Sequence, residues 1–258
     1  MTASADRSAL DRPAPPPDRV GSYGPGPEQV YDVYLAPGGD PRAWVVLVHG
    51  GFWRAEWDRT HLRPLARALA DDGYAVALVE YVRTGTPGGG WPATGEEVAA
   101  ALGAVRGQEA DGLPVVLVGH SAGGHLAVWA LHRPEAEGVA GAVSLAGCLN
   151  LRLVHELGLD GGAALDLLGG PPETDPAAWA GADPARLGRT AYPVVVVHGD
   201  QDEMVPLEVA RSWWERAGTP GRDRLVVLPW VTHFPLIDAE GPHLGLLLTQ
   251  IEGLLGPR

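Results

Sequence analysis

The sequence is poor in cysteine, in basic side chains and in long apolar stretches. One cysteine in 258 residues excludes an internal disulfide and a cysteine-based metal cluster, so we expect Cys148 to be a small buried apolar side chain. Lysine and arginine number 19 against 32 acidic residues, which gives a formal net charge of −13. A surface of this sign repels nucleic acids and anionic membranes, and we expect neither as a partner.

No segment reaches the roughly 18 consecutive apolar residues that a membrane span needs, and the first residues lack the apolar core of a secretory signal. The sequence therefore predicts a cytoplasmic protein. Residues 1–27 are rich in proline and charge, and we expect them to form a loose arm. The remaining residues, 28–258, suit a single large α/β domain.

From Val30 onward, apolar strand-like runs alternate with helical ones. Runs such as Trp44–Val48 lack the alternation of period two, which is typical of strands buried on both faces of a parallel sheet. We therefore expect an α/β fold with a doubly wound, mostly parallel sheet and helices on both faces. Between Leu151 and Arg189 the alternation gives way to short helical pieces with Gly-Gly and Pro-Pro pairs, which indicate a short cap insertion.

The run Val115–Gly124, VVLVGHSAGG, places one serine between two glycines, after a strand and before a helix. Ser121 would lie on a sharp turn, where Gly119 and Gly123 lack the Cβ atoms that would collide with neighbouring backbone. A serine hydroxyl needs a general base, and the base needs an acid to orient it. The pattern predicts a nucleophile if both partners follow.

Both partners follow in the chain order serine, acid, histidine that doubly wound hydrolases use. Asp200 and Asp202 both follow the predicted strand Tyr192–His198. We favour Asp202 as the acid, because Asp200 suits the tight turn itself. His233, just beyond the last predicted strand, is the best-placed base of the nine histidines, and His61 and His120 are expected to have structural roles.

A tetrahedral intermediate also needs backbone N–H donors for its oxyanion. Ala122 can supply one at the start of its helix, where N–H groups lack intrahelical partners. Gly51 and Phe52 can supply others after the strand Trp44–Val48. No histidine pair shows the spacing with a glutamate that a helical zinc site uses, so we predict no metal, and nothing indicates a cofactor.

These motifs resemble those of the α/β-hydrolase fold, and within it the esterase and arylformamidase (kynurenine formamidase) group. HGGFW at His49–Trp53 is similar to the oxyanion motif of the formamidases, and GHSAGGHLA at Gly119–Ala127 to their nucleophile elbow. HGDQDEMVP at His198–Pro206 resembles the acid loop of the family, and VTHFPLID at Val231–Asp238 its histidine loop. A bacterial group of relatives often reads EYRR where this chain has EYVR, with Val82 as the departure.

Trp53, Tyr81 and Trp91 follow strands or open a helix, so they are candidates for the substrate pocket, with ordinary packing as the equal alternative. The resemblance implies a serine hydrolase acting on a small ester or amide, either as an arylformamidase or as a carboxylesterase. A small-peptide hydrolase and a noncatalytic ligand-binding protein are the rivals. The sequence leaves open whether the chain forms a homodimer.

Overall fold

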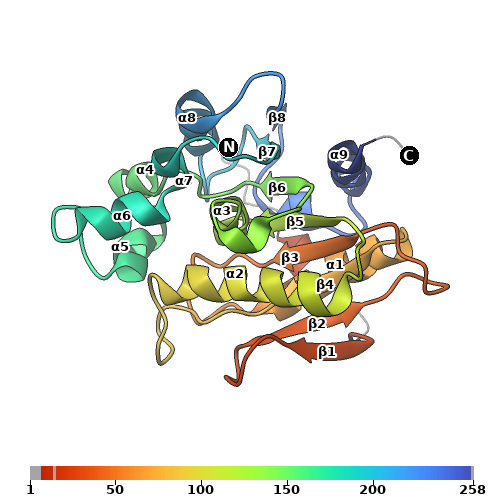
Figure 1. The fold of residues 1–258 in the computed structure, drawn as a ribbon. Helices are drawn as coiled ribbons and strands as arrows, with labels where there is room; N and C mark the ends of the chain where they lie inside the picture. The colour runs from red at the N-terminus through yellow and green to blue at the C-terminus, as the bar shows by residue number, and fades with distance from the viewer. Residues whose placement is uncertain (1–6, 14–15, 257–258) are drawn as a thin grey trace.

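An eight-stranded sheet forms the centre of the protein (Figure 1). The computed structural model describes residues 7–13 and 16–256. The strand order is β1-β2-β4-β3-β5-β6-β7-β8, with β2 antiparallel to both neighbours and the pairs from β4 to β8 parallel. The strands are β1 (Arg19–Ser22), β2 (Val30–Tyr34), β3 (Trp44–Val48), β4 (Ala75–Val79), β5 (Val115–His120), β6 (Gly141–Leu145), β7 (Val194–Gly199) and β8 (Arg224–Leu228).

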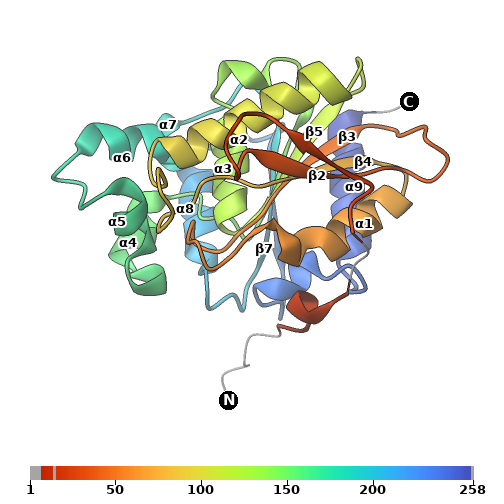
Figure 2. The same ribbon diagram turned by 90° about the horizontal axis from the view of Figure 1, so that it is seen from below.

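Side chains of the buried strands alternate between two apolar cores, one on each face of the sheet. In β3, Val46 and Val48 belong to the first core, and Val45 and Leu47 to the second. The first core is covered by α2, α3 and α8, and the second by α1 and α9; Figure 2 shows α2 and α1 on opposite sides of the sheet. This arrangement confirms the predicted doubly wound, mostly parallel fold.

The helices have the following bounds: α1 (Arg63–Asp71), α2 (Ala93–Ala104), α3 (Ala122–Ala130), α4 (Leu151–Glu156), α5 (Ala163–Leu168), α6 (Pro176–Ala182), α7 (Pro184–Leu187), α8 (Leu207–Ala217) and α9 (Leu244–Leu255). Short turns of helix are η1 (Ser8–Asp11), η2 (Arg59–Leu62), η3 (Val105–Glu109), η4 (Pro134–Ala136), η5 (Leu159–Gly161) and η6 (Phe234–Ile237). Within the described ranges, no helix is both long and apolar enough to cross a membrane.

The segment between β6 and β7 forms α4 to α7, which gather at one end of the molecule (Figure 1). Asp183 ends α6 and accepts the backbone N–H of Ala185 at the start of α7. Burial raises the pKa of Asp183 to about 6, although backbone N–H groups oppose the rise. The sequence suggested that this segment forms a cap. In the structure the segment packs beside the sheet, and its residue Asp160 of η5 lines the cavity described below.

The expectation of a loose arm over residues 1–27 is wrong for the part that the structure describes. β1 pairs antiparallel with β2 along four residues, from Arg19 opposite Val33 to Ser22 opposite Val30. η1 packs against η6, with Ala9 buried (Figure 2, red turn beside the blue segment). Backbone pairing and a few apolar contacts order this segment despite its polar composition. Residues 1–6 and 14–15 lie outside the described part.

Candidate active site

Ser121 lies on the turn that connects β5 to α3, with a backbone φ of 55° and ψ of −119°. This conformation is strained for a residue with a side chain. The glycines on either side make it sterically accessible: a Cβ on Gly119 would lie 2.1 Å from the Gly123 carbonyl oxygen, and one on Gly123 would lie 2.1 Å from that of Val48. The turn therefore holds Ser121 at the carboxyl edge of the sheet, close to β3.

Replacing Gly123 with alanine is expected to lower the free energy of unfolding by about 3 kcal/mol. The new Cβ would meet two backbone carbonyls, those of Val48 and His49, which no side-chain rotation can relieve. Gly245→Ala on α9 is the control, because a Cβ at that position would have no atom within 4 Å, and it is expected to stabilise the helix by about 0.5–1 kcal/mol. Urea unfolding of both variants measures the difference, and equal midpoints would contradict the steric argument.

His233 and Asp202 form a buried pair on the loops that follow β8 and β7. His233 Nδ1 lies 2.7 Å from Asp202 Oδ2, so the ring donates to the carboxylate and leaves Nε2 as the acceptor of a neutral imidazole. The other carboxylate oxygen, Oδ1, accepts the backbone N–H groups of Met204 and Val205 at 3.0 and 2.9 Å. Asp202 is therefore held from both oxygens, and it fixes the orientation of the ring.

Asp200 has a different role in the same loop. Its Oδ1 accepts the backbone N–H of Trp230 at 2.7 Å and the side-chain amide of Gln201 at 3.1 Å. These bonds tie the loop after β7 to the loop after β8, which carries His233. Asp200 thus stabilises the turn, whereas Asp202 contacts the histidine.

The loop after β3 runs beside Ser121 in an uncommon conformation. Gly51, Phe52 and Trp53 have successive φ angles of 110°, 47° and 59°, and a Cβ on Gly51 would lie 2.3 Å from that of Trp57. Ala122 is the first residue of α3, where helical N–H groups lack intrahelical partners. The predicted donors Gly51, Phe52 and Ala122 thus come from two segments that meet at Ser121.

Buried contacts of His49 with Glu80 and Tyr81 support this loop. His49 Nδ1 lies 2.8 Å from the Gly50 carbonyl and Nε2 lies 2.9 Å from Glu80 Oε1, so both ring nitrogens face oxygen acceptors. The Tyr81 ring stacks on His49 with centroids 4.2 Å apart and donates its hydroxyl to the His49 carbonyl at 2.9 Å. Burial opposes the ionisation of Glu80, but its bond to His49 and the charges of His49 and Arg83 lower its pKa to about 2.

This lowered pKa predicts a pH-dependent stability. Glu80 is ionised in the folded protein at pH values where an unfolded glutamate becomes protonated, so its contribution is full above pH 4.5 and is lost as the pH falls towards 2. Over this interval, the free energy of unfolding of the wild type is expected to fall by about 3 kcal/mol more than that of Glu80→Gln. Urea unfolding at pH 5, 4 and 3 tests this, because about 2 kcal/mol of the difference should already be lost by pH 3; parallel pH profiles would contradict it.

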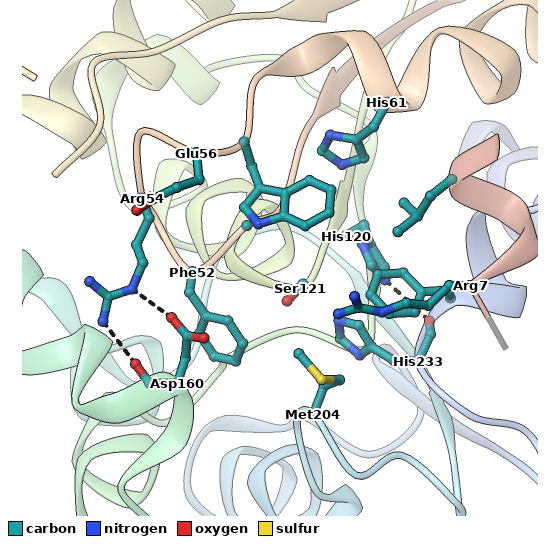
Figure 3. Close-up of a pocket in the computed structure, with 14 residues that line it drawn as sticks. Arg7, Phe52, Arg54, Glu56, His61, His120, Ser121, Asp160, Met204 and His233 are labelled. Atoms are coloured by element: carbon teal, nitrogen blue, oxygen red, sulfur yellow. Dashed lines mark hydrogen bonds and ion pairs between the residues drawn. The ribbon is translucent and has the colours of Figure 1, made fainter. Parts of the chain in front are cut away.

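Ser121 and His233 line one cavity of about 420 Å³ at the carboxyl edge of the sheet. Figure 3 shows Ser121 near its centre, with His233 and Arg7 on one side and Phe52, Arg54 and Asp160 on the other. The residues that line it are Arg7, Leu10, Gly51, Phe52, Arg54, Glu56, Trp57, His61, His120, Ser121, Asp160, Met204, His233 and Phe234.

The aromatic residues predicted for the substrate pocket lie elsewhere. Trp53 is fully buried, and its indole N–H donates to His125 Nδ1 at 3.1 Å. Tyr81 is fully buried under His49, and Trp91 packs edge-on against Trp129 with centroids 4.9 Å apart. None of these three side chains lines the cavity around Ser121, and each packs against other aromatic or histidine rings.

Several lining residues were missed in the sequence. Trp57 and His61 come from the segment between the oxyanion motif and α1, and Met204 belongs to the acid loop itself. His61 donates Nδ1–H to the Asp58 carbonyl, and burial together with the charge of His49 lowers its pKa to about 4. His120, for which the sequence also predicts a structural role, lies at the cavity with its ring centroid 4.5 Å from that of His233.

Cys148 is fully buried, as predicted, and burial raises the pKa of its thiol. In the described part of the chain, no three His, Cys, Asp or Glu side chains gather in a way that could hold a metal ion.

Solved structures of esterases share this fold. The bifunctional GH43-CE protein of Bacteroides eggerthii superposes with a TM-score of 0.78 at 21% identity, covering 91% of this chain and 35% of that chain. This chain therefore spans about a third of that protein. Esterase B of Lactobacillus rhamnosis gives a TM-score of 0.76 at 19% identity, covering 96% and 89% of the two chains. A thermophilic esterase of Thermogutta terrifontis gives 0.70 at 21%, covering 94% and 93%.

The sheet order, the serine turn and these neighbours define an α/β-hydrolase fold. No curated protein sequence matches this chain. Residues 31–216 match the model of the BD-FAE family, which is more than half of the sequence. The chain belongs to the BD-FAE family.

Proposed function

We propose that this protein is a serine hydrolase that cleaves a small ester or amide through an acyl-enzyme intermediate. The observation that carries the proposal is the buried Asp202–His233 pair, whose histidine lines one cavity with Ser121. In this mechanism His233 Nε2 takes the proton of the Ser121 hydroxyl as Oγ attacks the carbonyl carbon. Asp202 orients the ring and stabilises the imidazolium that forms.

Gly51, Phe52 and Ala122 supply the N–H donors for the oxyanion, each of which typically lowers the barrier by about 3–4 kcal/mol. The imidazolium of His233 then protonates the leaving group, and the ester between the acyl group and Ser121 remains. Water attacks this ester with the same ring as base, which regenerates the serine.

Arylformamidase activity is the specific form of this proposal, with a carboxylesterase as the second form. HGGFW at the oxyanion site is similar to the motif of the formamidases. A cavity of about 420 Å³ lined by Phe52, Trp57 and Phe234 suits a small substrate with an aryl group. An N-formyl anilide has a small acyl group and an aryl amine, which leaves more readily than an alkyl amine.

Two measurements test the proposal. A fluorophosphonate probe is expected to label the protein, because only an activated serine reacts with it, and absence of labelling would favour the noncatalytic alternative. Turnover of N-formylkynurenine, compared with p-nitrophenyl acetate and butyrate, separates the two forms. A preference for the esters without any formamide turnover would exclude the arylformamidase form.

A further inference from the structure

The N-terminal segment forms one wall of the candidate active site. Arg7 and Leu10 line the cavity with Ser121 and His233. The segment is clamped to the loop after His233, because the Arg12 guanidinium binds both oxygens of Asp238 at 2.9 and 3.0 Å and Glu240 at 2.6 Å. It is thus attached to the same loop that carries the catalytic histidine of the proposed function.

Arg7 differs from the other guanidinium group of the cavity. Arg54 is bound to Asp160 at 2.5 Å and to Asp166 at 2.9 Å, so its charge is paired within the protein. The side chain of Arg7 lies over the ring of Phe234, 5.3 Å from the centroid. Within the described residues it forms no ion pair, and it is exposed. Among the residues that the structure describes, Arg7 is therefore the guanidinium of this cavity that has no carboxylate partner.

The side of Ser121 on which Arg7 lies indicates which part of a substrate would meet it. Phe234 packs edge-on against His233 with centroids 5.1 Å apart, so Arg7 and the imidazole contact the same ring. In Figure 3, Arg7 and His233 are on one side of Ser121, and Arg54 and Asp160 are on the other. Because the general acid must reach the leaving atom to protonate it, the leaving group lies on the histidine side.

We propose that Arg7 is a specificity-determining residue that binds a carboxylate on the leaving group of the substrate. The proposal rests on the proposed hydrolase function. Arginine suits this role because its planar donors match a carboxylate in a bidentate arrangement. The position matters in a protein of net charge −13, whose field otherwise repels anions. On the other side of the cavity, Arg54 is already paired with Asp160 and Asp166, so it is less available to a carboxylate there than Arg7 is.

The test compares two aryl acetates that differ in one negative charge on the leaving group, 4-acetoxybenzoate and methyl 4-acetoxybenzoate. The ratio of their kcat/KM values is measured for the wild type, Arg7→Gln and Arg7→Lys. In Arg7→Gln, the anionic-to-neutral ratio is expected to fall by about fivefold, as for one partly solvated charge contact. Arg7→Lys keeps the charge and should retain part of the preference.

Arg133→Gln is the matched control. Arg133 is also exposed and also stacks on an aromatic ring, 5.2 Å from the centroid of Trp129, but it does not line the cavity. Its loss changes the net charge of the protein by the same amount and should leave the ratio unchanged. The wild-type preference should also weaken at 1 M salt, because an exposed contact is screened.

Two outcomes would overturn the proposal about Arg7. If Arg7→Gln lowered kcat/KM equally for both acetates, Arg7 would have a structural role. If Arg133→Gln lowered the anionic-to-neutral ratio as much as Arg7→Gln does, the effect would be one of overall charge. Failure of the underlying function has a different signature: the wild type would turn over neither acetate and would not react with the fluorophosphonate probe.

Discussion

Replacing Ser121 with alanine is expected to lower kcat by about three orders of magnitude or more. The variant lacks the oxygen that forms the acyl-enzyme, and the remaining groups of the cavity can only orient water. The measurement is kcat for the best substrate of the ester and formamide panel, together with labelling by the fluorophosphonate probe. We expect labelling of the wild type and none of Ser121→Ala.

Ser212→Ala provides the matched control for this prediction. Ser212 lies on α8, outside the cavity, and donates its hydroxyl to the Val209 carbonyl at 2.8 Å. Ser212→Ala also removes one serine hydroxyl oxygen, but its kcat should stay close to that of the wild type. If Ser121→Ala kept substantial activity with the usual fold, Ser121 would not be the nucleophile.

The second large effect is expected at Asp202. Its Oδ1 accepts two backbone N–H groups, from Met204 and Val205. In Asp202→Asn the amide oxygen must take that position, so the NH₂ group turns towards His233. The ring would then have to accept at Nδ1, which places its proton on Nε2, where it cannot take a proton from Ser121. We therefore expect kcat to fall by about four orders of magnitude at neutral pH, as in a triad with the wrong tautomer.

Asp200→Asn is the control, because it makes the same chemical change two residues away. Asp200 accepts from Trp230 and Gln201 in the turn, and an amide oxygen can replace its carboxylate oxygen there. We expect a change in kcat of less than about tenfold, consistent with the loss of one charge-assisted bond. An equal fall in both variants would contradict the assignment of the acid to Asp202.

The parts of the site that could be predicted from the sequence depend on local backbone rules. A Gly-x-Ser-x-Gly segment between a strand and a helix restricts the turn at Ser121 before any distant contact is known. Asp202 and His233 follow strands of one parallel sheet, and the carboxyl ends of such strands meet at one edge. The sheet itself follows from apolar runs such as Val194–Val197, which need cover on both faces.

The parts that were missed depend on contacts between distant residues or on the direction of a side chain. β1 has the sequence RVGS and is mostly exposed, so its order comes from pairing with β2 and leaves no periodic pattern. The φ of 59° at Trp53 turns its ring towards His125, and a position after a strand does not show this. Arg7 is held at the cavity by contacts far along the chain, among them the bond of Arg12 to Asp238, 226 residues away.

The clamp between Arg12 and Asp238 also has a consequence for synthesis on the ribosome. Asp238 lies 226 residues after Arg12, so Arg12 is synthesised well before its partner. The clamp on the wall that carries Arg7 and Leu10 therefore cannot form before residue 238 has been made, although β3, β4 and β5 can already pair. Because contacts of such long sequence separation form late, the emerging protein completes its sheet first and its binding cavity last.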